Sequence, residues 1–198
     1  MCLHVGVQFW FWKLFWKLKQ NRKYISFDIS YYWSSIVFQK IHQNLQFLWF
    51  IFIKNKLKSL DAKIFKNQVY LEHLHLQNNN MKVLPDDVFT SLTHLKILDL
   101  SNNKLKALPE RVFFSNRGLI WLNLSSNNLR NLENDLFSNQ DNLETLKLSH
   151  NQITKISREN FLNLGRLEEL FLDHNKIYSF RDGFLMEIFR IVKNSSIN

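Results

Sequence analysis

Two groups of histidines have the spacing that best suits chemistry. His73 and His75 lie two residues apart in a segment that alternates polar and apolar residues, so on a strand both side chains project from one face. Such a pair could ligate zinc together with a third residue. The chain has a single cysteine and no third ligand that recurs at a suitable position. The sequence therefore favours two solvated histidines and predicts no metal site and no cofactor.

A second group combines His150, His174 and Asp173. The two histidines are 24 residues apart, and we expect them at equivalent positions on neighbouring strands, which lie about 4.8 Å apart. Because imidazole titrates near pH 6.5, this group could form a pH-sensitive contact. The alternative is that both histidines are ordinary variants at the end of a strand.

The sequence does not predict catalysis. A nucleophile needs a base within hydrogen-bond reach and a pocket, whereas the Ser, His and Asp residues are scattered along the chain. The four glycines do not have the spacing of a phosphate-binding loop. We expect a protein that is not an enzyme.

The elements that carry these histidines belong to a repeat of 24 residues. The position that we number one is Leu71, Leu95, Leu119, Leu143 and Leu167, and positions four and six are also leucine in these five repeats. Position nineteen is Phe89, Phe113, Phe137 and Phe161, followed by Leu185. The same frame extends back to Phe47, so the sequence contains six repeats over 47–190.

Position nine is asparagine in every repeat and forms a predicted structural ladder: Asn55, Asn79, Asn103, Asn127, Asn151 and Asn175. The chain turns there as it leaves a strand, and buried backbone groups in the turn need hydrogen-bond partners. An amide side chain supplies both a donor and an acceptor. We expect the phenylalanines to form a second apolar seam. We also expect Pro85 and Pro109 to start the segments of their repeats that lie on the side opposite the strands.

The pattern resembles the leucine-rich repeat, in the 24-residue form typical of extracellular proteins such as Toll-type receptors and chondroadherin-like proteins. The resemblance implies an α/β-repeat solenoid with a parallel β-sheet on its concave face and short irregular or helical convex segments. Stacking is required because one repeat cannot bury its apolar face alone. The resemblance also implies non-enzymatic recognition of a protein or peptide.

The side chains expected on the concave face differ from repeat to repeat and are the predicted ligand-binding residues: His73, His75, Ile97, Asp99, Trp121, Asn123, Thr145, Lys147, Glu169 and Phe171. Trp121 and Phe171 suit a protein interface, where aromatic residues are common anchors. The alternative is that these two are isolated exposed apolar residues, which are normal on any protein.

The charge distribution argues against a nucleic-acid partner. The formal net charge is +9, but residues 1–70 hold 11 Lys and Arg against 2 Asp and Glu, whereas residues 71–198 hold 15 of each. Most of the repeat array is therefore neutral and lacks the basic stripe that phosphate tracking requires.

The ends of the chain depart from the repeat. Residues 1–23 are basic and aromatic, and they fit a poor signal peptide, a membrane-surface helix or a disordered leader. Residues 24–46 fit a degenerate repeat that covers the first strand, and 191–198 fit the start of a truncated repeat or a frayed tail. We expect a fragment of a longer protein, with a short natural protein as the alternative.

Features of the sequence give conflicting indications of the cellular compartment. The repeat type favours an extracellular or cell-surface receptor, adhesion, matrix or immune protein, with signal transduction as a role and membrane association through the N-terminal or a missing segment. Asn123-Leu-Ser125 and Asn194-Ser-Ser196 are glycosylation sequons. The single Cys2 leaves no disulfide-bonded caps, which favours the alternative of an intracellular scaffold or adaptor. The oligomeric state is open.

Overall fold

The computed structural model describes residues 25–26, 49–180 and 194–196 of the 198-residue chain. The predicted leader at 1–23, most of the predicted cover at 24–46 and most of the sequence after 180 lie outside the described residues. Phe47 and Leu185, two positions of the repeat frame, also lie outside them.

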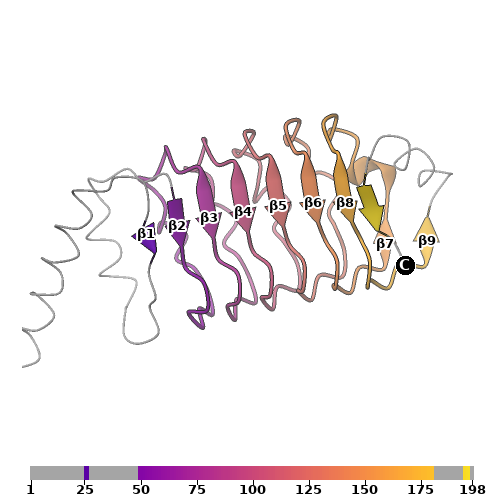
Figure 1. Cartoon of the computed structure of the whole chain (residues 1–198), viewed down its shortest axis with the longest axis horizontal. Helices are drawn as coiled ribbons and strands as arrows, with labels where there is room; N and C mark the ends of the chain where they lie inside the picture. Colours follow the sequence, from indigo (N-terminus) through magenta and orange to yellow (C-terminus); the bar gives the residue numbers. More distant parts are fainter. Residues whose placement is uncertain (1–24, 27–48, 181–193, 197–198) are drawn as a thin grey trace, which may run out of the picture.

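One parallel sheet runs along the molecule (Figure 1). Its strands, in spatial order, are β1 (Ile25–Ser26), β2 (Trp49–Ile51), β3 (His73–His75), β4 (Ile97–Asp99), β5 (Trp121–Asn123), β6 (Thr145–Lys147), β8 (Glu169–Phe171) and β10 (Asn194–Ser196). Leu74, Leu98, Leu122, Leu146 and Leu170 pair in one unbroken row from β3 to β8. The predicted solenoid of parallel strands is confirmed.

The interior is filled by the leucine columns and by a stack of phenylalanine rings. The leucines at positions one, four and six are between 0 and 4% exposed. Phe65, Phe89, Phe113 and Phe137 follow one another behind the sheet, with successive ring centroids 6.2, 6.3 and 6.2 Å apart. The rings of Phe89, Phe113 and Phe137 are almost parallel, with angles of 6° between the planes of neighbours. This seam joins the repeats on the side away from the strands.

The asparagine ladder joins the repeats at the ends of the strands. Nδ2 of Asn127 donates to the carbonyls of Leu124 in its own repeat, at 3.1 Å, and Leu100 in the preceding one, at 3.0 Å. Oδ1 of Asn127 accepts the backbone N–H of Leu105, also in the preceding repeat, at 3.1 Å. Asn79, Asn103, Asn151 and Asn175 make the same three kinds of bond. Each rung is thus hydrogen-bonded to the one before it through a side chain.

The segments opposite the sheet are mostly turns. The turns after Pro85 and Pro109 begin with bonds from the N–H of Val88 and Val112 to the proline carbonyls, at 3.3 and 3.1 Å. Later repeats differ: β7 (Lys155–Ile156) pairs in parallel with β9 (Ser179–Phe180), and η1 (Arg158–Asn160) is a short 3₁₀ helix. Within the described part of the chain, none of the helices has the length and hydrophobicity of a membrane-spanning segment.

Candidate functional site

The outward side chains of the sheet form two rows, which together we call the sheet face. Strand pairing places Trp49, His73, Ile97, Trp121, Thr145 and Glu169 in the row of position three. The same pairing places Ile51, His75, Asp99, Asn123, Lys147 and Phe171 in the row of position five. The leucine between the two positions is buried in the strands β3 to β8, so the residues of the rows point to the other side.

The centre of the C-terminal half of the sheet face is a lysine between two aromatic rings. Nζ of Lys147 on β6 lies 5.5 Å from the ring centroid of Trp121 on β5 and 5.2 Å from that of Phe171 on β8. All three side chains are half-buried. Each contact has the distance of a cation–π interaction, which holds the ammonium beside the rings without neutralising it. The cluster therefore presents aromatic surface and one positive charge together.

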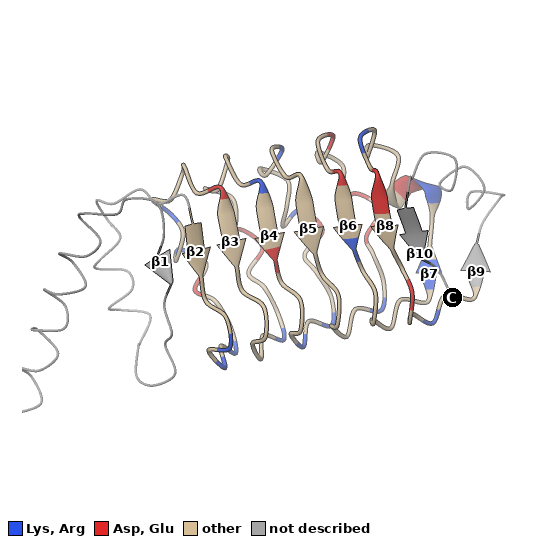
Figure 2. Cartoon of the chain, in the orientation of Figure 1, with Lys and Arg blue, Asp and Glu red and all other residues tan. Residues whose placement is uncertain are grey.

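The next pair in the row of position three is polar. Oγ1 of Thr145 donates to Oε2 of Glu169 at 3.1 Å. Glu169 and Lys147 thus lie on neighbouring strands with opposite charges, and Figure 2 shows both signs interspersed along the strands and loops of the described repeats. This part of the sheet face combines aromatic, cationic and anionic side chains within three adjacent strands.

The N-terminal half of the sheet face is organised by a residue outside the predicted set, Trp49. Its ring stacks on His73 with centroids 3.7 Å apart and an angle of 10°, and it lies 6.0 Å from His75. Burial lowers the pKa of His73, an effect that neighbouring Glu72 partly offsets. Burial also lowers the pKa of His75, against the opposing charge of Asp99. The interpretation of these histidines as freely solvated is wrong, because both are half-buried beside an indole ring.

Asp99 and Asn123 fold back on their own turns. Oδ1 of Asp99 accepts the N–H of Ser101 at 2.9 Å and its hydroxyl at 2.7 Å, and Asp99 is only 8% exposed. Oδ1 of Asn123 accepts the N–H of Ser125 at 3.0 Å and also its hydroxyl. Both side chains are therefore engaged in ending their strands. Ile97, beside Asp99, is half-buried in the sheet face.

Buried amides on the far side of the core also escaped the sequence analysis. Nδ2 of Asn116, which is fully buried, donates to the carbonyls of Phe89 at 2.9 Å and Leu92 at 2.8 Å. Nε2 of Gln140, also fully buried, donates to the carbonyl of Phe113 at 2.8 Å. Both residues occupy position twenty-two, where Gln68 also stands. The recurrence of an amide at this position was the available signal.

His150, Asp173 and His174 come together at the turns that follow β6 and β8. The two imidazole rings stack with centroids 4.2 Å apart, and Nδ1 of His174 lies 2.9 Å from Oδ2 of Asp173. Within the described part of the chain, these three residues bring one potential metal-ligand atom each to within 4.8 Å of the others.

Comparisons with known proteins agree with this architecture. A family model described as "Leucine rich repeat" matches residues 53–105, 69–129 and 117–177. The comparison with curated proteins found no match. Among solved structures, the APL1 leucine-rich repeat domain superposes with a TM-score of 0.70 at 23% identity, covering 81% of this chain and 41% of that one.

Two further structures contain bound partners. The TLR13–ssRNA13 complex gives a TM-score of 0.69 at 23% identity, covering 82% of this chain and 26% of that one. The glycosylated Toll–Spatzle complex of Drosophila gives 0.68 at 30% identity, covering 76% and 20%. The chain thus spans less than half the length of each of these proteins.

Proposed function

Because the chain belongs to the leucine-rich-repeat family, we propose that it recognises a protein or peptide through its sheet face, by occupancy and without a covalent step. The family's fold is typically an interaction scaffold, and an open sheet displays side chains over a wide area. The residues that we assign to recognition are the ten predicted ones together with Trp49. Asp99 and Asn123 contribute mainly by holding the strand ends.

The observation that carries this proposal is the cluster of Trp121, Lys147 and Phe171. Aromatic side chains supply large contact areas at low entropic cost, and they dominate interface energies. Here two of them flank a lysine on adjacent strands at 5.5 and 5.2 Å. A partner segment with an apolar side chain and a carboxylate would contact the rings and the ammonium at the same time.

A protein suits this face better than a nucleic acid. Among the twelve sheet-face side chains of strands β2 to β8, one is lysine, one is aspartate and one is glutamate. Phosphate binding requires several cations in a row. Related structures include both kinds of partner: a Toll–Spatzle complex and an LRIM1/APL1C complex, but also a TLR13–ssRNA13 complex. The near-neutral charge of the sheet face supports a protein partner.

We place the chain outside the cell, as part of a cell-surface receptor or a secreted adhesion, matrix or immune protein with a role in signalling. Support comes from its likeness to Toll. The alternative is an intracellular scaffold or adaptor, which is favoured by the single cysteine because disulfide bonds are typical of extracellular proteins. Expression in a secreting cell separates the two: glycosidase treatment should increase the gel mobility of the wild type. Ser196→Ala, which destroys the sequon at Asn194 and leaves Asn123 untouched, should remove that change.

Site-specific photo-crosslinking in cells tests the binding face. Benzoylphenylalanine in place of Phe171 probes the sheet face, and the same residue in place of Phe114, which is 45% exposed on the opposite side, is the matched control. We expect discrete protein adducts from position 171 that disappear with Lys147→Glu. Adducts of equal yield from both positions, or adducts insensitive to Lys147→Glu, would reject the sheet face as the binding surface.

A further inference from the structure

We propose that His150, Asp173 and His174 bind a divalent metal ion of the late first transition series, with Zn²⁺ as the physiological occupant. The three side chains lie in the turns after β6 and β8, beyond the residues assigned to protein recognition. The proposal therefore stands independently of the sheet face.

The repeat geometry sets the two histidines side by side. Both occupy position eight of their repeats and have the same left-handed backbone conformation, with φ of 56°. The N–H of His150 donates to the carbonyl of Asp173 at 2.9 Å, which ties the two turns together. Asn78, Asn102 and Ser126 hold position eight with φ of 60°, 53° and 55° in the earlier repeats, but carry no imidazole. Among the described turns, only those at His150 and His174 therefore place two imidazoles on neighbouring repeats.

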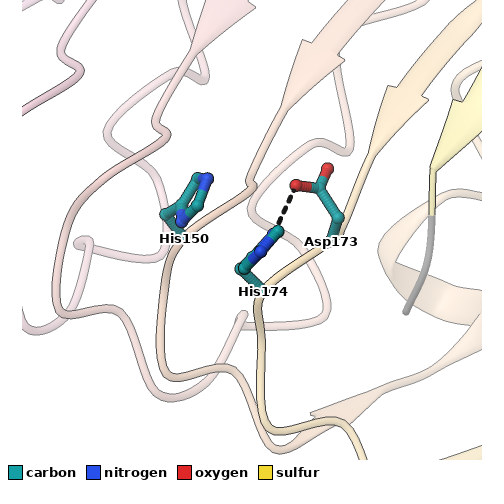
Figure 3. Close-up of side chains that lie close together, drawn as sticks. All are labelled: His150, Asp173 and His174. Atoms are coloured by element: carbon teal, nitrogen blue, oxygen red, sulfur yellow. Dashed lines mark hydrogen bonds and ion pairs between the residues drawn. The ribbon is translucent and has the colours of Figure 1, made fainter.

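The two rings stack because each is projected from an equivalent turn. Their centroids are 4.2 Å apart and their planes differ by 19° (Figure 3). Both histidines are exposed, so a rotation about their side-chain bonds meets solvent and not packed neighbours. A metal ion with Zn–N bonds of about 2.0–2.1 Å requires its donors to be about 2.8–3.4 Å apart for angles of about 90–110°. Three donor atoms within 4.8 Å of one another reach this spacing by small side-chain rotations.

Asp173 supplies the carboxylate and is already oriented. Its Oδ2 lies 2.9 Å from Nδ1 of His174, which is close to the spacing of two donors on one metal ion. Its Oδ1 accepts the hydroxyl of Ser149 on the neighbouring rung at 2.6 Å, so the carboxylate is fixed from the far side. A metal ion would replace the proton shared by Asp173 and His174. A hydrogen-bond partner such as Ser149, which orients a metal ligand, commonly raises metal affinity by about 10–100-fold.

The donor set selects the metal. Imidazole nitrogen favours Zn²⁺, Cu²⁺ and Ni²⁺, whereas Mg²⁺ and Ca²⁺ prefer all-oxygen sites. The only other close histidine pair in the described residues, His73 and His75, is half-buried against Trp49 and lacks a carboxylate bond of this kind. With three protein ligands at the surface, a fourth position stays open to water or to a group from another molecule.

The test is a competition titration of the full chain with Zn²⁺ and a colorimetric chelator at pH 7.5, since Zn²⁺ binds only deprotonated ligands. We expect His150→Ala, His174→Ala and Asp173→Asn each to raise the Kd for Zn²⁺ by at least about tenfold, because loss of a ligand costs at least as much affinity as the roughly 10–100-fold loss seen for groups that only orient one. His94→Ala, which removes another exposed histidine, is the matched control and should leave the Kd unchanged. Excess Mg²⁺ should not compete.

A second readout separates ligation from damage to the fold. Zn²⁺ should raise the melting temperature of the wild type, because it binds only the folded site, and should perturb the imidazole NMR signals of His150 and His174. The double variant His150→Ala/His174→Ala should melt like the wild type without metal. The proposal is overturned if the double variant binds Zn²⁺ as tightly as the wild type, or if the perturbed imidazoles are those of other histidines.

Discussion

Replacing Asn127 by leucine should cost a large part of the stability of the array. Asn127 lies in the middle of the ladder and is 6% exposed. The change keeps the size and branching of the side chain but removes its donors and its acceptor. The backbone N–H of Leu105 then loses its partner, the Oδ1 atom at 3.1 Å. The carbonyls of Leu100 and Leu124 each lose one of two bonds, because Asn103 and Asn151 still donate to them at 3.1 and 3.0 Å.

The magnitude follows from these three groups. A buried N–H left without a partner costs about 1–3 kcal/mol, and a lost hydrogen bond to a carbonyl that keeps another donor costs about 0.5–1.5 kcal/mol. The sum is about 2–6 kcal/mol. Domains of this size have free energies of unfolding of about 5–15 kcal/mol, so the variant should melt well below the wild type.

Urea denaturation followed by circular dichroism measures this loss. Asn128→Leu is the matched control, since the described residues contain no hydrogen bond from its side chain and it is half-buried in the same turn. We expect the control to change the free energy of unfolding by no more than about 1 kcal/mol, as is usual at sites without such partners. Equal losses in the two variants would refute the hydrogen-bond reasoning.

The remaining predictions concern the aromatic seam and the histidines. Phe113→Ala should lower the free energy of unfolding by about 3–5 kcal/mol, because both stacked neighbours lose their partner; Phe114→Ala, at an exposed position, should change it far less in the same urea titration. The free energy of unfolding should also fall as the pH drops below about 6.5, the pKa of free histidine. Burial lowers the pKa values of His73 and His75 in the folded protein, so at these pH values the unfolded chain binds more protons than the folded one. The double variant His73→Gln/His75→Gln should flatten this pH dependence; an unchanged slope would contradict burial as its cause.

The sequence was sufficient to predict the framework because the framework is periodic. Leu74 and Leu98 pair opposite each other because they occupy the same column, and the same logic places the strands β3, β4, β5, β6 and β8 of the main sheet. A column also predicts direction: the alternation around Leu122 sends Trp121 and Asn123 to the sheet face. Periodicity therefore indicates both the fold and the list of exposed candidates.

The contacts among these candidates depend on side-chain conformation, which periodicity does not determine. Asp99 was expected to face a ligand, yet its carboxylate binds Ser101 in the adjoining turn. Trp49 stacks on His73 because both stand in the row of position three on neighbouring strands, a pairing that the frame implied but the predicted set omitted. Lys147 lies between two rings because it stands directly opposite Phe171 in the strand register and diagonally across from Trp121.

The ladder also gives the molecule a direction. The N–H of Met81 is satisfied by Oδ1 of Asn103, which belongs to the following repeat, and the N–H groups of Leu105, Leu129 and Ile153 depend on their successors in the same way. During synthesis on the ribosome, each coil would stay incomplete until the next two dozen residues had emerged. Shortening the array from its two ends is therefore not equivalent. Removal of the last coil leaves a backbone N–H without its acceptor, whereas removal of the first leaves side-chain atoms without partners, an amide hydrogen and the Oδ1 of Asn79.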